Sequence, residues 1–94
     1  MYLYNISIII EENHHDLLTS WLKKEWLPSL SREAKFLKMI NTPHEGHTYC
    51  VQLIVDNEAE IDQFQQTDLT SLQDHIAINY KEKAFIFDSV MQYL

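Results

Sequence analysis

The chain has 94 residues, of which 46% are hydrophobic, and we expect one globular domain over residues 1–94. The formal net charge of −7 argues against a nucleic-acid partner, because that affinity depends on neutralising phosphates. No apolar run is long enough to cross a bilayer, and the single cysteine, Cys50, fits a reducing compartment. We therefore expect a soluble cytoplasmic protein with no membrane partner.

Residues 2–10 predict a β-strand with two unlike faces, because successive side chains of a strand point to opposite sides of a sheet. One face is wholly apolar or aromatic and consists of Tyr2, Tyr4, Ile6, Ile8 and Ile10. The other face is half polar and consists of Leu3, Asn5, Ser7 and Ile9.

Helical spacing follows the first strand. Leu18, Leu22 and Trp26 recur at intervals of four and predict a helix over about residues 14–25. Asn13 is a suitable N-cap for this helix. Pro28 lacks a backbone N–H, so we expect it to end or kink the helix.

Residues 36–42 and 48–55 predict a β-hairpin, because residues 43–47 between them include the only glycine and one of two prolines. The second strand of this hairpin alternates cleanly. Its apolar face consists of Tyr49, Val51, Leu53 and Val55, and its half-polar face of Thr48, Cys50, Gln52 and Ile54.

The last third of the chain predicts a second helix and a final strand. Asp56 and Asn57 are suitable caps, and we expect an interruption at 65–68 with Asp68 capping a continuation to about Tyr80. The strand over 84–91 has an aromatic side, which we assign to the core, and a second side, which we assign to the half-polar face. These sides are Phe85, Phe87, Ser89 and Met91, and Ala84, Ile86, Asp88 and Val90.

The order strand, helix, strand, strand, helix, strand predicts an α+β ferredoxin-like fold: a four-stranded antiparallel sheet with both helices on one face. The helices should cover the apolar face. The half-polar face then keeps enough aliphatic side chains to indicate a partner, and we expect a homodimer that closes a dimeric α+β barrel. The predicted dimer interface consists of Leu3, Asn5, Ser7, Ile9, Cys50, Gln52, Ile54, Ile86 and Asp88. The alternative is an exposed face with scattered aliphatic residues.

With this element order, the chain resembles the domain-of-unknown-function family 4286. The resemblance lies in the Tyr4–Ile8 strand, in the helix that carries Trp21 and ends in Leu27-Pro28, in the Thr48–Gln52 strand and in Phe85-Ile86-Phe87. It implies a ferredoxin-like fold and no established activity. At two positions the chain departs from the family pattern. Trp26 stands where the family often has His, and Asp88 stands where it often has Arg.

No metal or cofactor is expected from the chemistry-bearing residues. His44 and His47, with Glu45 between them, are possible zinc ligands. Two ligands on a glycine-containing turn do not make a closed site, however. His14 and His15 read as exposed residues of a first helical turn. Cys50 reads as a small packing residue, since no cation alternates onto its face of the central strands.

Two functional hypotheses remain beside a purely structural dimer, and they leave open whether the protein is an enzyme. The first is small-molecule binding by a site made of Trp21, Lys24, Trp26, Tyr4 and Tyr49. The alternative rests on similarity in size and strand order to dimeric α+β barrel proteins, which include cofactor-free and haem-degrading monooxygenases. That similarity implies Asn5 and His75 as catalytic candidates.

Overall fold

A computed structural model describes residues 1–43 and 45–94 of the chain. Its four strands are β1 (Tyr2–Ile10), β2 (Lys35–Lys38), β3 (His47–Val55) and β4 (Ala84–Gln92). The first helical segment comprises η1 (Glu12–His14), α1 (His15–Trp21), η2 (Leu22–Trp26) and α2 (Leu27–Ser29). The second comprises α3 (Glu58–Phe64), η3 (Gln65–Leu69) and α4 (Thr70–Asn79). The helices are too short or too polar to span a membrane within the described residues.

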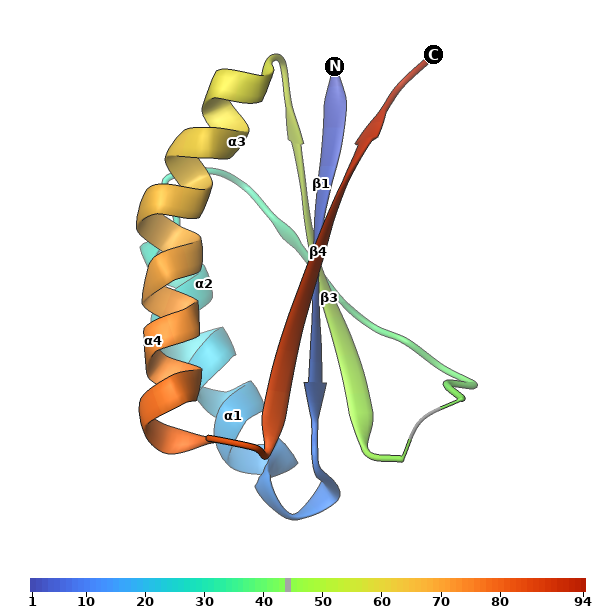
Figure 1. Cartoon of the computed structure of the whole chain (residues 1–94), viewed down its shortest axis with the longest axis vertical. Helices are drawn as coiled ribbons and strands as arrows, with labels where there is room; N and C mark the ends of the chain where they lie inside the picture. Colours follow the sequence, from blue (N-terminus) through green and yellow to red (C-terminus); the bar gives the residue numbers. More distant parts are fainter. Residues whose placement is uncertain (44) are drawn as a thin grey trace.

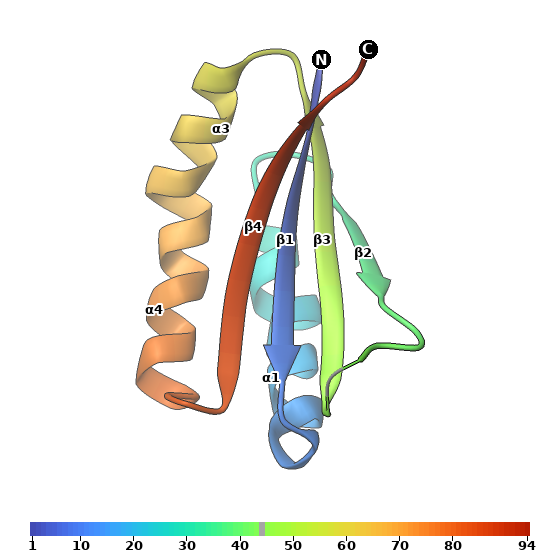
Figure 2. The same ribbon diagram turned by 45° about the vertical axis from the view of Figure 1, so that its right-hand side comes forward.

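The four strands form one antiparallel sheet in the order β2-β3-β1-β4. Both helical segments lie on the same side of this sheet, and the opposite side carries no helix (Figures 1 and 2). This is the ferredoxin-like α+β architecture, and it confirms the fold class predicted from the order of elements. Crossovers of this kind place both helices on one face because each connection turns in the same sense.

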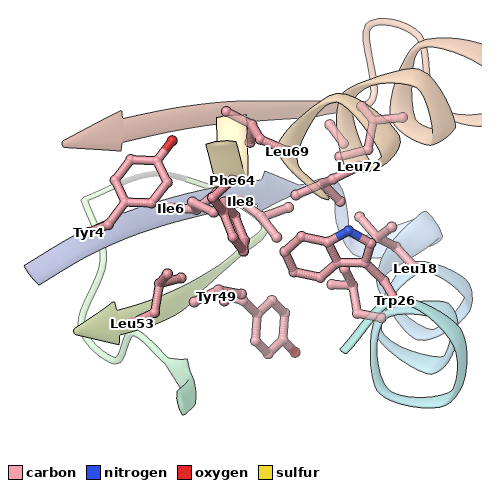
Figure 3. Close-up of a cluster of buried hydrophobic side chains, with 14 of the residues drawn as sticks. Tyr4, Ile6, Ile8, Leu18, Trp26, Tyr49, Leu53, Phe64, Leu69 and Leu72 are labelled. Carbon is pink, nitrogen blue, oxygen red and sulfur yellow. The ribbon is translucent and has the colours of Figure 1, made fainter. Parts of the chain in front are cut away.

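The core lies between the helices and the sheet. The faces predicted for β1 and β3 are confirmed, because Tyr4, Ile6 and Ile8 of β1 and Val51 and Leu53 of β3 are buried there. Figure 3 shows these strands contributing to one cluster with side chains of both helical segments. The helical contributors include Leu18, Leu22, Trp26, Phe64, Leu69 and Leu72.

The face assignment of β4 was wrong. In the register of β4 with β1, Ile10 pairs with Ala84 and Ser7 pairs with Phe87. Ala84 is therefore buried under the helices, whereas Phe85 and Phe87 are 53% and 60% exposed on the opposite face. Both sides of this strand carry apolar residues, so alternation alone does not choose between them, and the register with β1 decides.

The first helical segment is longer than predicted and passes through Pro28. Asn13 lies inside the η1 turn and does not cap α1, whose N-cap residue is His14. The π-helical turn η2 precedes Pro28, and the chain stays helical to Ser29. Pro28 cannot donate a backbone hydrogen bond to the preceding turn, and the helix ends one residue after it. The expected end at Pro28 is thus only one residue early.

The second helical segment begins as predicted and continues without a break. Asn57 caps α3, since its Oδ1 accepts a hydrogen bond from the Glu60 backbone N–H at 3.1 Å. Glu60 reciprocates by accepting from the Asp56 N–H at 2.7 Å. The expected interruption takes the form of the π-helical turn η3 rather than a gap. Asp68 therefore lies inside the helix and does not cap a new one.

The connection from β2 to β3 contains the single glycine at a position that requires it. Gly46 has φ +84°, and a Cβ atom there would lie 2.5 Å from the Ile10 carbonyl oxygen at the end of β1. The hairpin is confirmed, with β2 shorter than predicted, and the Met39 N–H extends the pairing by donating to the Thr48 carbonyl at 2.9 Å. His44 lies outside the described residues.

Candidate functional site

The face of the sheet opposite the helices, which we call the open face, is the largest exposed apolar surface that the strands present. Its side chains form cross-strand rows because paired residues of neighbouring strands point the same way. From β2 to β4, one row runs Leu37, Cys50, Ser7, Phe87 and the next runs Lys35, Gln52, Asn5, Ser89. A third row consists of Ile54, Leu3 and Met91. The polar row thus lies between apolar rows.

Hydrogen bonds link the polar groups at the centre of the open face. Gln52 Nε2 donates to Asn5 Oδ1 at 3.1 Å, and Asn5 Nδ2 donates to Ser7 Oγ at 3.1 Å. Ser7 Oγ lies 3.7 Å from Cys50 Sγ. We call Asn5, Ser7, Cys50 and Gln52 the polar ladder. These hydrogen bonds use part of the capacity of the two amides, which reduces the cost of covering the ladder with another surface.

Next to the polar ladder the open face is hollowed. The hollow has a volume of about 550 Å³ and is lined by Ser7, Ile9, Met39, Thr48, Phe85 and Phe87. Thr48 forms its floor, since this residue is buried although it points away from the helices. A volume of this size lies in the range of small-molecule sites.

A second hollow, of about 680 Å³, lies at the other end of the open face, where Arg32, Lys35 and Tyr93 take part in its lining. The Arg32 guanidinium is already held by Glu60 at 2.8 Å. This pair and a backbone hydrogen bond from Asp56 lower the pKa of the Glu60 carboxyl, the backbone bond having the larger effect. The Arg32 guanidinium is therefore already paired with a carboxylate of the same chain.

Four rings gather between the start of α1 and the start of β3. Phe36 stacks on Tyr49 with 5.3 Å between ring centroids, Tyr49 stacks on His15 at 5.6 Å, and His15 stacks on His47 at 3.8 Å. We call these four residues the ring cluster. They come from β2, β3 and the first helical turn, so only the tertiary fold brings them together.

Polar contacts connect the two histidines of the ring cluster to Tyr49 and to acidic side chains of the first helical segment. His15 Nε2 bonds the Tyr49 hydroxyl, and its Nδ1 lies 3.1 Å from Asp16 Oδ1. His47 Nε2 bonds Glu12 Oε2. Burial, together with the negative charges of Asp16 and Glu12, raises the pKa of Tyr49. The phenol therefore keeps its proton at neutral pH, and the Tyr49 hydroxyl shares a hydrogen bond with His15 Nε2.

This arrangement links Tyr49 to solvent-exposed Asp16 through His15. It does not resemble a metal centre, because no group of three His, Cys, Asp or Glu side chains in residues 1–43 and 45–94 has metal-binding geometry. Neither of the two hollows described above is lined by these rings.

A second polar contact involves Tyr4 under the helices. The Tyr4 hydroxyl donates to Asp88 Oδ2 at 2.5 Å, and Gln65 Nε2 lies 3.3 Å from the same carboxylate oxygen. Burial is the main cause that raises the pKa of Tyr4, and the carboxylate of Asp88 adds to it. The phenol of Tyr4 is therefore a fixed hydrogen-bond donor that ties β1 to β4 and η3.

The family model described as a domain of unknown function, DUF4286, matches residues 1–94. The chain belongs to the DUF4286 family. Its membership confirms the resemblance drawn from the strand and helix motifs. A search of curated proteins gives no significant match to this DUF4286 chain.

Solved structures share the fold of this DUF4286 chain at low sequence identity. An EthD (ethyl tert-butyl ether D) family protein from Bacillus halodurans has a TM-score of 0.65 and 9% identity over 100% of both chains. HapK from Hahella chejuensis has a TM-score of 0.63 and 17% identity over 100% of this chain and 93% of its own. A DABB family protein with a ferredoxin-like fold from Mesorhizobium loti has a TM-score of 0.51 and 9% identity over 100% and 99% of the two chains. At these identities the likeness supports the fold alone.

The open face of the DUF4286 chain contains seven of the nine residues predicted for the dimer interface. These are Leu3, Asn5, Ser7, Ile9, Cys50, Gln52 and Ile54. Ile86 and Asp88 do not belong to it, because they pair with Ile8 and Ile6 and point to the helix side. Phe85, Phe87 and Met91 take their places, so the open face is more apolar than the sequence predicted.

The predicted ligand-binding residues of the DUF4286 chain are not brought together. Tyr4 and Trp26 are core residues on either side of Phe64, whose ring lies edge-on to both. Trp21 stacks on His75 at 3.5 Å between the two helical segments. Tyr49 lies in the ring cluster, and Lys24 is exposed.

The two catalytic candidates lie on opposite sides of the sheet. Asn5 belongs to the polar ladder of the open face, whereas His75 lies on α4 against Trp21. Burial lowers the pKa of His75, so its ring is neutral around neutral pH and packs as an aromatic group.

Sequence reasoning missed the ring cluster and the exposed aromatic side of β4. His15 was read as an exposed first-turn residue, and its side chain is instead only 21% exposed. The available signal was the alternation of β3, which places His47 and Tyr49 on the same face, next to the helix that starts at His15.

The two departures from the family pattern both contact η3. Trp26 Nε1 donates to the Asp68 carbonyl at 3.0 Å, and Asp88 accepts from Gln65. A histidine or an arginine at these positions would change how this π-helical turn is held.

Proposed function

We propose that the protein acts as a homodimer in which two open faces pack together and close an α+β barrel, and that this barrel protein binds a small molecule. The observation that supports the dimer best is the exposure of large apolar side chains along β2 and its extension, β3 and β4, on a face that no helix covers. They include Leu37, Met39, Ile54, Phe85, Phe87 and Met91.

The extent of the open face agrees with this proposal. Three strands of nine residues and one of four, at about 4.8 Å spacing and about 3.3 Å rise per residue, project to roughly 500 Å². The relief of the side chains increases the accessible area toward the roughly 800 Å² per partner of a standard interface. Patches of this size on a water-exposed surface are typical of protein contacts.

The polar ladder also favours a second copy of the chain as the partner. Because part of the hydrogen-bonding capacity of its amides is already used within one sheet, a partner needs to supply fewer matching donors and acceptors. An isologous contact, in which the same surface meets itself across a two-fold axis, needs only self-complementary relief.

Sedimentation velocity at micromolar concentration tests the dimer. We expect the wild-type chain to sediment as a dimer and Phe87→Glu to sediment as a monomer, because the charge would be buried without a partner. Ile78→Glu is the matched control, since Ile78 is 80% exposed on α4 and lies outside the open face. A monomeric wild type, or a Phe87→Glu dimer, would refute the proposed interface.

Small-molecule binding is tested separately by a thermal-shift screen of metabolites, because a ligand that binds only the folded state raises the unfolding temperature. The alternative function, a cofactor-free or haem-degrading monooxygenase of the dimeric α+β barrel type, is less well supported. Asn5 and His75 lie too far apart to act on one substrate, being on opposite sides of the sheet. A haem titration without a Soret shift would eliminate its haem-dependent form.

A further inference from the structure

We propose that the dimer encloses a cavity between the two open faces, over the hollow beside the polar ladder, and that this cavity binds a neutral, largely apolar small molecule. The proposal rests on the dimer proposed above and names the site and the chemical class of its ligand.

Side-chain length makes the open face concave. In two adjacent rows the central strands β3 and β1 contribute Thr48 with Ile9 and Cys50 with Ser7. The outer strands contribute longer side chains to the same rows, namely Leu37 and Met39 on one edge and Phe85 and Phe87 on the other. Three of the four central side chains are short and the side chains at both edges are long, which produces a trough along the centre.

Two such troughs that face each other leave a space between them. The long edge side chains of the two copies make contact before the central serine, cysteine and threonine side chains can. Protein interiors contain few voids larger than a water molecule, and an unfilled apolar cavity lowers stability. A hollow of about 550 Å³ on each copy is therefore better explained by a ligand than by an empty space.

The lining determines the class of ligand. None of the six residues that line the hollow is charged, and four of them are the apolar Ile9, Met39, Phe85 and Phe87. A charged ligand would lose its hydration without gaining an ion pair. Ser7 and Thr48 supply hydroxyl groups that can orient one polar group of the ligand. A flat or branched apolar molecule with a single hydroxyl, carbonyl or amine fits this chemistry.

The probe for this site is N-phenyl-naphthylamine, a neutral fluorescent ring compound with one N–H group. We expect saturable binding to the wild-type dimer with at most one probe per chain. Because the probe contacts both copies, it should also strengthen association, by about tenfold when its free concentration is ten times its dissociation constant. Sedimentation with and without the probe measures this coupling.

The variant that fills the hollow is Ser7→Leu, which we expect to remain dimeric and to bind the probe at least about tenfold more weakly. Ser71→Leu is the matched control, because Ser71 is exposed on α4, and it should bind like wild type. If Ser7→Leu does not fold, the effect of the probe on dimer association of the wild-type chain still tests the proposed cavity.

Three outcomes would overturn the inference: no binding by a dimeric wild type, unchanged binding by a folded Ser7→Leu, or dissociation of the dimer by the probe. The last would show that the probe competes with the second copy for the open face. The first two outcomes would refute the cavity but not the dimer. A monomeric wild type would refute the dimer itself, so failure of the cavity and failure of the dimer are distinguishable.

Discussion

At the scale of single residues, Tyr4 shows how a buried phenol is used as a fixed connector. Its ring packs against Phe64 in the core, and its hydroxyl donates to Asp88 at 2.5 Å. The pKa of Tyr4 is raised, chiefly by burial, and the pKa values of Tyr49 and Tyr80 are also raised. The folded chain therefore retains phenol protons that the unfolded chain releases near pH 10.

This gives a prediction for alkaline stability. A raised folded-state pKa contributes stability that is fully present below pH 10, the ordinary tyrosine value, and is lost as pH rises above it. Tyr4→Phe should lower the free energy of unfolding by about 1 kcal/mol at pH 7, since one hydrogen bond is lost. It should also make the loss of stability above pH 10 shallower. Urea unfolding at several pH values measures both.

The control for Tyr4→Phe is Tyr93→Phe, because Tyr93 is half exposed near the C-terminus. Its free energy of unfolding at pH 7 should equal that of wild type. If Tyr4→Phe retained the full alkaline loss of stability, Tyr4 would not be one of its sources.

At the scale of elements, the two π-helical turns are the unusual feature. Both interrupt an otherwise α-helical segment, and a wider turn leaves backbone carbonyls outside the regular ladder. The indole N–H of Trp26, from η2, donates to the carbonyl of Asp68 in η3. Partial burial also raises the pKa of the Asp68 carboxyl. This hydrogen bond joins the two π-helical turns across the helix pair.

Trp26→Phe tests this contact. It removes the only donor of the side chain, leaves the Asp68 carbonyl without its partner and opens a small void, so we expect a loss of about 2–3 kcal/mol in the free energy of unfolding. Hydrogen exchange should become faster in residues 65–70 than in the rest of the second helical segment.

Trp21→Phe is the matched control, because its indole stacks on His75 and is only partly buried. We expect it to cost about 1 kcal/mol or less and to leave exchange in η3 unchanged. Equal losses for the two variants would mean that the contact between the turns has no special role.

At the scale of the whole molecule, the division of the sheet into a covered face and an open face is the dominant fact. If two open faces pack together, unfolding also separates the chains, so its midpoint depends on protein concentration. A tenfold dilution costs about 1.4 kcal/mol, which corresponds to a decrease of roughly 3–6 °C for two chains of this length.

Thermal unfolding over a hundredfold range of concentration measures this dependence. The same series on Phe87→Glu should show a constant midpoint, because that variant is expected to be a monomer. A constant midpoint for the wild type would argue against association at these concentrations.

The amino-acid sequence alone determined the order of elements, the fold class and the apolar faces of β1 and β3. Each of these follows from short-range patterns: clean alternation on β1 and β3, and the cap formed by Asn57. Such patterns are local, so they can be read without knowing what packs against them.

Only the tertiary structure decided which side of β4 faces the helices and which rings meet at the start of α1. Both sides of β4 carry apolar residues, and the pairing of Ala84 with Ile10 places Ala84 under the helices and Phe85 and Phe87 on the open face. The ring cluster joins residues of three elements that are separated by up to 34 positions, as for His15 and Tyr49. Contacts of this kind depend on register and packing between distant segments, which local alternation does not encode.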